Sequence, residues 1–127
     1  MNIHSPFTLP DVEFVGGATQ ELMFHCYHKI NRKPSDLSPY TANFSVISYV
    51  NKYGSPLISK PMNILQGTDT EDGICNILTV VLDPSDTKDL RGKYIYQITI
   101  KDVADLAEIP GQGLLHITNN INKGFIS

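Results

Sequence analysis

Residues 89–100 carry the strongest pattern in the sequence, a loop that leads into an alternating strand. From position 94 the even residues are Tyr94, Tyr96, Ile98 and Ile100, whereas the odd positions include polar side chains. A period of two is typical of a strand with one buried face. The pattern therefore predicts an antiparallel strand late in the chain, whose buried face must be covered by strands that precede it.

The start of this strand follows the order D-x-x-G-x-Y-x-Y, formed by Asp89, Gly92, Tyr94 and Tyr96. β-Sandwich domains build a tyrosine corner at this spacing: a Tyr near the start of a strand donates its hydroxyl to the backbone upstream, and the residue two positions later points into the core. Tyr94 is the predicted corner and Tyr96 the predicted core residue. A Tyr-rich amphipathic strand without a corner is the simpler alternative.

Length and charge limit the classes of protein to consider. A chain of 127 residues fits a single domain, residues 1–127, which buries roughly two-thirds of the surface of its unfolded chain. The net charge is -3 and no basic run is present, so we expect no nucleic-acid partner. No apolar run has the length of a membrane helix, and the first residues lack a basic region and an apolar core, so we expect neither a membrane anchor nor a conventional secretion signal.

The two cysteines are predicted to remain free thiols. Cys26 shares the parity of Leu22 and Phe24, whereas Cys75 has the parity opposite to the predicted buried face of its strand. Without a β-bulge the two side chains point to different sides of a sheet. In sandwiches with a disulfide the partner cysteine lies on the late strand, where Tyr96 stands here. Free thiols fit folding in a reducing cytoplasm.

The rest of the chain divides into short segments of strand pattern separated by turn residues. Besides the late strand, strands are predicted at residues 11–15, 20–28, 41–50, 57–60, 63–65, 74–82 and 113–119. Residues 1–10, with two prolines, are predicted to form an extended arm, and residues 120–127 a short tail. Pro61 is expected to end the strand before it. Residues 102–113 are expected to form a polar hairpin loop.

One short helix interrupts the strands. Asp83 as N-cap and Pro84 at the first helical position predict a single helical turn before the late strand. About seven to eight short strands with frequent turns indicate an all-β fold, an immunoglobulin-like antiparallel β-sandwich. Phe24, Phe44 and Tyr96 are predicted to meet between its sheets, together with Val80. A jelly roll or small barrel is the alternative architecture.

No residue pattern predicts catalysis, a cofactor or a metal. His25 and His28 are three apart on a strand, so they point to opposite faces and cannot both reach one ion. Acidic residues at 69–72 and at 83, 86 and 89 lack the ligand register of a calcium loop, and turns and helix caps explain them. There is no G-x-S-x-G elbow and no Gly-rich phosphate loop.

Aromatic residues supply the candidate binding positions. Tyr27, Tyr40, Tyr49 and Tyr53 lie near predicted strand ends and loops, where aromatics suit carbohydrate or protein partners. Tyr40 and Tyr53 are candidate partner-binding residues, with Phe125 in the tail. The alternative is that these rings only cover the rim of the sandwich.

Taken together, the order of residues resembles the N-terminal domain of phage upper baseplate proteins. The resemblance spans residues 12–122. It is carried by residues 14–19, which lead into the strand of Leu22 and Phe24, and by residues 36–37, 42–44, 86–97, 112–113, 115–117 and 119–121. The run around Tyr94 is the most specific part. Such domains usually precede a longer partner-binding region, whereas this sequence ends at Ser127, so we expect a small free-standing tail or baseplate structural protein without a receptor-binding role.

The resemblance implies docking by surface complementarity and no turnover of substrate. The expected partners are other phage tail or baseplate proteins, with copies of this chain as a homo-oligomer, and the expected location is the virion after synthesis in the bacterial cytoplasm. The arm at residues 1–10 and the apolar residues Phe125 and Ile126 are candidates to reach a neighbouring subunit. A carbohydrate-binding or adhesion module that uses loop tyrosines is the alternative, and a cryptic hydrolase the third class.

Overall fold

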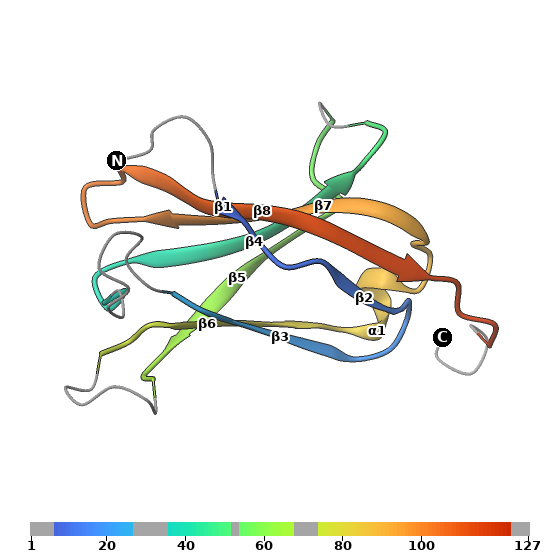
Figure 1. Ribbon diagram of the computed structural model, residues 1–127, viewed down its shortest axis with the longest axis horizontal. Helices are drawn as coiled ribbons and strands as arrows, with labels where there is room; N and C mark the ends of the chain where they lie inside the picture. The colour runs from blue at the N-terminus through green and yellow to red at the C-terminus, as the bar shows by residue number, and fades with distance from the viewer. Residues whose placement is uncertain (1–6, 27–35, 52–53, 68–73, 123–127) are drawn as a thin grey trace.

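A computed structural model describes residues 7–26, 36–51, 54–67 and 74–122 of the chain. Figure 1 shows its elements in order. They are β1 (Phe7–Thr8), β2 (Val12–Val15), β3 (Gln20–His25), β4 (Thr41–Ser48), β5 (Ile58–Leu65), β6 (Ile77–Leu82), α1 (Pro84–Thr87), β7 (Gly92–Lys101) and β8 (Ala107–Thr118). The helical turn after Asp83 and every strand except β1 overlap segments expected from the sequence pattern. β1 was not expected as a strand, β4 ends at Ser48 and not at residue 50, and β6 begins at Ile77 and not at residue 74. The segments expected at 57–60 and 63–65 are one strand, β5.

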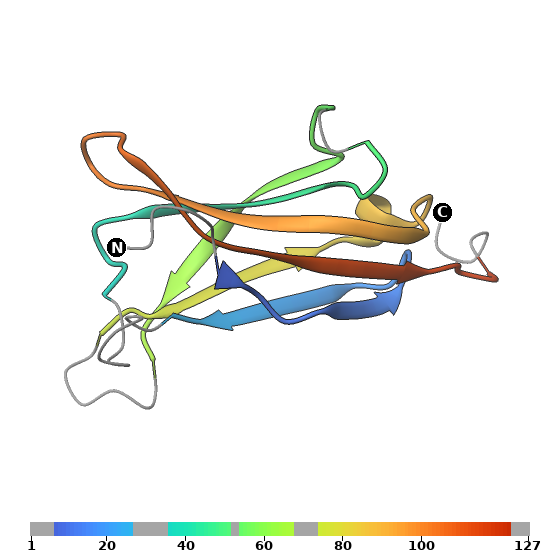
Figure 2. The ribbon, with the colours of Figure 1, turned by 45° about the horizontal axis from the view of Figure 1, so that its top comes forward.

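The strands form two layers that share β5, as Figure 2 shows. One layer has the order β8-β7-β4-β5, and the other has the order β5-β6-β3. Residues 58–62 of β5 pair with β4, and residues 63–65 pair with β6. Within the described residues β2 pairs only with β8 and β3 only with β6, so the sheet does not close into a barrel. The prediction of an immunoglobulin-like β-sandwich is confirmed.

The N-terminal strands join the outer edge of β8. All other pairs of strands are antiparallel, but β1 and β2 both run parallel to β8. Residues 7–10 of the predicted extended arm therefore lie on the sandwich itself: the Leu9 N–H donates to the carbonyl of Gln112 at 2.8 Å. Residues 1–6 lie outside the described part of the chain.

Two further expectations, about Pro61 and about residues 102–113, were wrong. Pro61 does not end a strand, because β5 continues to Leu65; at Pro61 it pairs with β4 alone, and proline is tolerated in a strand with one open edge. Residues 102–113 are not a long loop, because β8 begins at Ala107 and a β-bulge between Ile98 and Ile100 accommodates the added length.

Strand β7 organises the core. Its inward residues Tyr94, Tyr96, Ile98 and Ile100 are all buried. Neighbouring positions on the facing layer are also buried: Leu78, Val80 and Leu82 of β6. The alternation predicted for β7 is thus the actual division between core and surface, whereas in β6 Ile77 and Thr79 on the other face are buried as well and only Val81 is exposed.

An aromatic cluster fills the centre of the core. The ring of Tyr96 lies 5.6 Å from that of Phe44 in the same layer and 5.6 Å from that of Phe24 in the opposite layer, measured between centroids. Phe44 and Tyr96 are completely buried, whereas Phe24 is partly buried. On β8 the residue opposite Tyr96 is Gly113, where a Cβ would lie only 2.6 Å from the tyrosine ring. Glycine is therefore required beneath the ring.

Tyr94 makes the hydrogen bonds of a tyrosine corner. Its hydroxyl donates to the carbonyl of Arg91 at 2.9 Å and accepts the Arg91 N–H at 3.0 Å. Gly92 between them has a φ of +102°, a conformation that side chains other than glycine rarely adopt. The D-x-x-G-x-Y-x-Y order therefore reflects a backbone requirement at Gly92 and a hydrogen-bond requirement at Tyr94.

We expect Phe44→Ala to lower the free energy of unfolding by about 3–5 kcal/mol, because it removes a completely buried ring from the aromatic cluster. Urea unfolding followed by circular dichroism measures this change. Thr41→Ala, at an exposed position of the same strand, is the control and should change the free energy by less than about 0.5 kcal/mol. A loss below about 1 kcal/mol for Phe44→Ala would contradict its place in the core.

Candidate functional site

The described residues contain no group of three or more His, Cys, Asp or Glu side chains that could hold a metal ion. His25 is exposed on β3, and His116 on β8 lies beside a carboxylate, with 3.1 Å between its Nδ1 and Glu13 Oε2. His28 lies outside the described residues. Cys26 and Cys75 are free thiols. No helix in the described ranges is long and apolar enough to span a membrane.

The predicted aromatic positions do not form one site. Tyr40 precedes β4 and packs partly buried against the core, whereas Tyr49 follows β4 and places its ring under the amine of Lys93, 5.9 Å from the ring centroid. A strand of this length separates the two rings by roughly 30 Å. Tyr27, Tyr53 and Phe125 lie outside the described residues.

The outer face of the β5-β4-β7-β8 layer carries an apolar row. Ile47 of β4 lies opposite Ile95 of β7, which lies opposite Leu114 of β8. Leu57, just before β5, lies beside this row and donates its N–H to the carbonyl of Val46 at 2.8 Å. Leu57 is 52% exposed and Leu114 38% exposed, and the two isoleucines are partly exposed. We call Leu57, Ile47, Ile95 and Leu114 the apolar row.

Polar side chains on one side of the apolar row are hydrogen-bonded to one another. The hydroxyls of Ser45 and Ser59 both donate to Asn43 Oδ1, at 3.1 and 3.2 Å. Gln112 Nε2 donates to Gln97 Oε1 at 2.6 Å. Because these groups already have partners within the sheet, a surface that packs on them does not leave them without hydrogen bonds.

The side chains on the other side of the apolar row also interact with one another in pairs. The row there consists of Tyr49, Lys93, His116 and Glu13, in which Tyr49 contacts Lys93 and His116 contacts Glu13. The outer face thus has an apolar centre with polar flanks. In the sequence, the apolar side chains of this face stand at outward positions of the alternating strands, where polar residues are expected. Only the register between the strands shows that they form one row.

A groove of about 440 Å³ lies between the start of β4 and the middle of β5. Tyr40 and Thr41 line it from one side and Met62 and Asn63 from the other. Every residue that lines it is uncharged. Of the candidate partner-binding residues, Tyr40 is therefore placed beside a concave surface.

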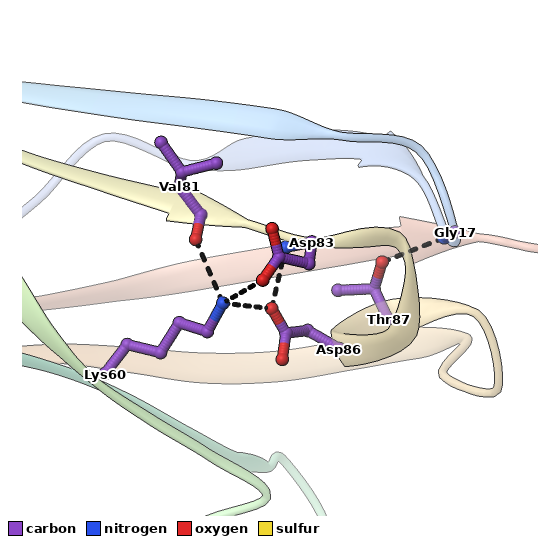
Figure 3. A network of polar contacts seen from close by, with 6 residues as sticks. All are labelled: Gly17, Lys60, Val81, Asp83, Asp86 and Thr87. Carbon is purple, nitrogen blue, oxygen red and sulfur yellow. Dashed lines mark hydrogen bonds and ion pairs between the residues drawn. The ribbon is translucent and has the colours of Figure 1, made fainter.

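Lys60 forms the main polar network, shown in Figure 3. Its side chain leaves β5 where that strand separates from β6 and donates to the carbonyl of Val81 and to Asp83 Oδ2, each at 3.1 Å. It also forms an ion pair with Asp86, whose carboxylate accepts the N–H of Asp83 at 2.7 Å. Two of the carboxylates considered for calcium therefore serve a lysine and a helix start, which is a structural role.

The same helical turn fixes the turn between β2 and β3. The hydroxyl of Thr87 is completely buried and accepts the N–H of Gly17 at 2.8 Å. At Gly16 a Cβ would lie 2.6 Å from the carbonyl of Thr87. Two runs that are far apart in the sequence, residues 14–19 and 86–97, are therefore in direct contact at this end of the sandwich.

We expect the free energy of unfolding to fall as the pH rises from about 9 to 12. Burial raises the pKa of Cys26 from 9.0 to about 11, and burial with the nearby charge of Asp11 raises the pKa of Tyr96 from 10.0 to about 12. The hydrogen bond to Asp86 raises the pKa of Lys60. In each case the folded state holds a proton that the unfolded state releases, so stability that is complete below the unfolded pKa is lost above it.

Urea unfolding at pH 8, 9.5 and 11 in reducing buffer, followed by circular dichroism, measures this fall. Cys26→Ala should remove part of the fall between pH 9 and 11. Cys75→Ala is the matched control, because Cys75 does not pack against the core cluster. Stability that stays constant from pH 8 to 11 would contradict the prediction.

Comparisons with known proteins find a solved structure of similar fold but do not assign the chain to a family. No protein-family model and no curated protein matches the chain. Among solved structures the chain is similar to the fibronectin(III)-like modules of Clostridium thermocellum CbhA, with 13% identity, a TM-score of 0.41, and coverage of 91% of this chain and 96% of that chain. A likeness at this level says nothing about partners or activity, and the resemblance to phage upper baseplate domains stays a prediction.

Proposed function

We propose that this chain is a non-enzymatic structural protein of a phage or prophage tail or baseplate, which assembles by docking against other tail or baseplate proteins or further copies of itself. The sequence resemblance over residues 12–122 supports the class of assembly. The observation that carries the docking mechanism is the apolar row on the outer face of the β5-β4-β7-β8 layer.

The composition of this face suits a protein interface. Interfaces between proteins typically have an apolar centre and a polar rim. Here the apolar row occupies the centre, and polar and charged rows flank it on both sides. Full burial of an exposed leucine contributes on the order of 1.5–3 kcal/mol. Leu57 and Leu114 are 52% and 38% exposed, so each would contribute part of that amount on docking.

The state of the partly buried Cys26 supports a role without catalysis. Nucleophilic cysteines have a lowered pKa, because the thiolate is the reactive form. Burial raises the pKa of Cys26 to about 11, in the opposite direction. Asp83 and Asp86 both form ion pairs with Lys60, so these two carboxylates serve a structural contact.

The test is incorporation into particles. Phage particles, or particles from the induced prophage, are purified from the host that carries this gene and analysed for the chain by mass spectrometry. We expect the wild-type chain in the particles and at least tenfold less of the double variant Leu57→Asp/Leu114→Asp, because the variant places two charges in the interface.

Met23→Asp is the matched control, since Met23 is 50% exposed on β3 in the other layer. The control should enter particles like the wild type, and all variants should keep the wild-type circular dichroism spectrum. Absence of the wild-type chain from particles would refute the proposed class of assembly. Equal incorporation of the double variant would refute docking through the apolar row.

Carbohydrate binding is a second candidate, favoured by the groove beside Tyr40. An aromatic ring together with hydroxyl and amide groups, here Thr41 and Asn63, is a suitable surface for a sugar ring. This candidate predicts binding on a glycan array that is reduced at least tenfold by Asn63→Ala and retained by Tyr49→Ala at the other end of β4. Tyr53→Ala tests the loop position outside the described residues. An array without binding to the wild-type chain would eliminate the candidate.

A further inference from the structure

The turn between β7 and β8 presents apolar side chains to solvent. We call residues 102–109 the hairpin tip; it projects from one end of the sandwich in Figure 2. Val103 is 92% exposed, Leu106 66% and Ile109 46%. The sequence pattern predicted a polar loop here, because turns that only reverse the chain are rich in polar residues. Three branched apolar residues within seven positions call for a different explanation.

Hydrogen bonds hold the hairpin tip in one conformation. The carboxylate of Asp102 accepts the N–H groups of Ala104 at 2.8 Å and Leu106 at 3.0 Å. The backbone closes the same turn, because the Asp102 N–H donates to the carbonyl of Leu106 at 3.1 Å and the Asp105 N–H to the carbonyl of Asp102 at 3.0 Å. Asp105 has a φ of +62°, which costs conformational energy for a residue other than glycine. A preorganised loop loses less entropy on binding than a mobile one.

The charge around these apolar residues is negative. Asp102, Asp105 and Glu108 contribute three carboxylates, and the nearby amine is that of Lys101, 4.0 Å from Asp105 Oδ1. Asp105 and Glu108 are both exposed. A complementary surface therefore combines an apolar pocket with basic residues on its rim.

We propose that the hairpin tip is a second docking element, which inserts Val103 and Leu106 into an apolar pocket of a different protein whose rim carries Lys or Arg. A second copy of this chain does not offer such a pocket in its groove beside Tyr40, since every residue that lines that groove is uncharged. Anionic membranes repel carboxylates, so a lipid surface is a poor match. The proposal does not depend on the apolar row or on the phage assignment.

The test uses a defined set of candidate partners: the proteins encoded next to this gene, each expressed and purified. Binding of the full chain to each is measured by biolayer interferometry at 50 and 500 mM NaCl. We expect one of them to bind the wild-type chain. The variant Val103→Ser/Leu106→Ser keeps Asp102 and its hydrogen bonds to the backbone, and should bind that protein at least tenfold more weakly.

The charge contribution is tested separately. Asp105→Asn/Glu108→Gln should weaken binding severalfold at 50 mM NaCl and have little effect at 500 mM, because salt screens exposed charges. Asparagine tolerates the positive φ at position 105. Val50→Ser is the matched control: Val50 is 93% exposed in the turn after β4, which the register with β7 places at the opposite end of the sandwich.

Three outcomes would overturn the proposal. The first is a set of candidate proteins none of which binds. The second is binding that Leu57→Asp/Leu114→Asp abolishes but Val103→Ser/Leu106→Ser leaves unchanged, which would support the apolar row alone. The third is binding of the wild-type chain to vesicles of phosphatidylglycerol and phosphatidylcholine that Val103→Ser/Leu106→Ser abolishes, which would assign the hairpin tip to a membrane.

Discussion

The packing of Tyr96 is the interaction on which the rest of the structure depends. Its ring contacts Phe44 in its own layer and Phe24 in the facing layer, so one side chain joins both halves of the core. Its hydroxyl donates to the carbonyl of Pro10 at 2.6 Å, which fixes the segment between β1 and β2. Gly113 makes room for the ring on β8. Core, N-terminal strands and last strand thus meet at a single residue.

The two layers are joined by backbone as well as by side chains. β5 pairs with β4 over its first half and with β6 over its second half, so the chain passes from one layer to the other without a loop. Before the paired part of β5 and β6 begins, Lys60 of β5 reaches β6 through its side chain and donates to the carbonyl of Val81. The polar network at α1 thus connects β5 to β6 and to the helical turn by side-chain contacts, and none of its contacts involves the apolar row.

Local pattern predicted the parts of the fold that depend on alternation. The buried positions of β4 and β7, the tyrosine corner at Tyr94 and the helical turn after Asp83 all follow from residues adjacent in sequence. In β6 the pattern predicted the buried side chains of Leu78, Val80 and Leu82 but not the burial of Ile77 and Thr79 on the other face. β5 continues past Pro61 because one edge of the strand has no neighbour at that position, and β8 begins early because it pairs with β7 from Ala107 onward. Both depend on the neighbouring strands and not on local sequence. Turn composition suggested a long polar loop after Lys101, whereas Asp102 alone closes the turn in five residues.

The candidate surfaces could be predicted less well, for the same reason. Ile47, Ile95 and Leu114 lie in three separate strands, and their alignment requires the register of two ladders. The loop tyrosines appeared to be neighbours because they all lie near strand ends, but Tyr40 and Tyr49 are at opposite ends of β4. The exposure of Val103 and Leu106 depends on the bulge and on the short turn. The sequence pattern thus shows which residues are apolar or aromatic, but not which of them lie on the same face of the folded chain.

The parallel pairing of β2 with β8 determines how the molecule carries a load. The four pairs from Val12–Leu115 to Val15–Thr118 connect the first full strand to the last one, and the two strands point the same way. A pull that separates the ends of the chain therefore slides these strands along each other and strains all of their hydrogen bonds at once, instead of opening them one by one. Because β1 also runs parallel to β8, tension applied in this direction would load both N-terminal pairings in shear.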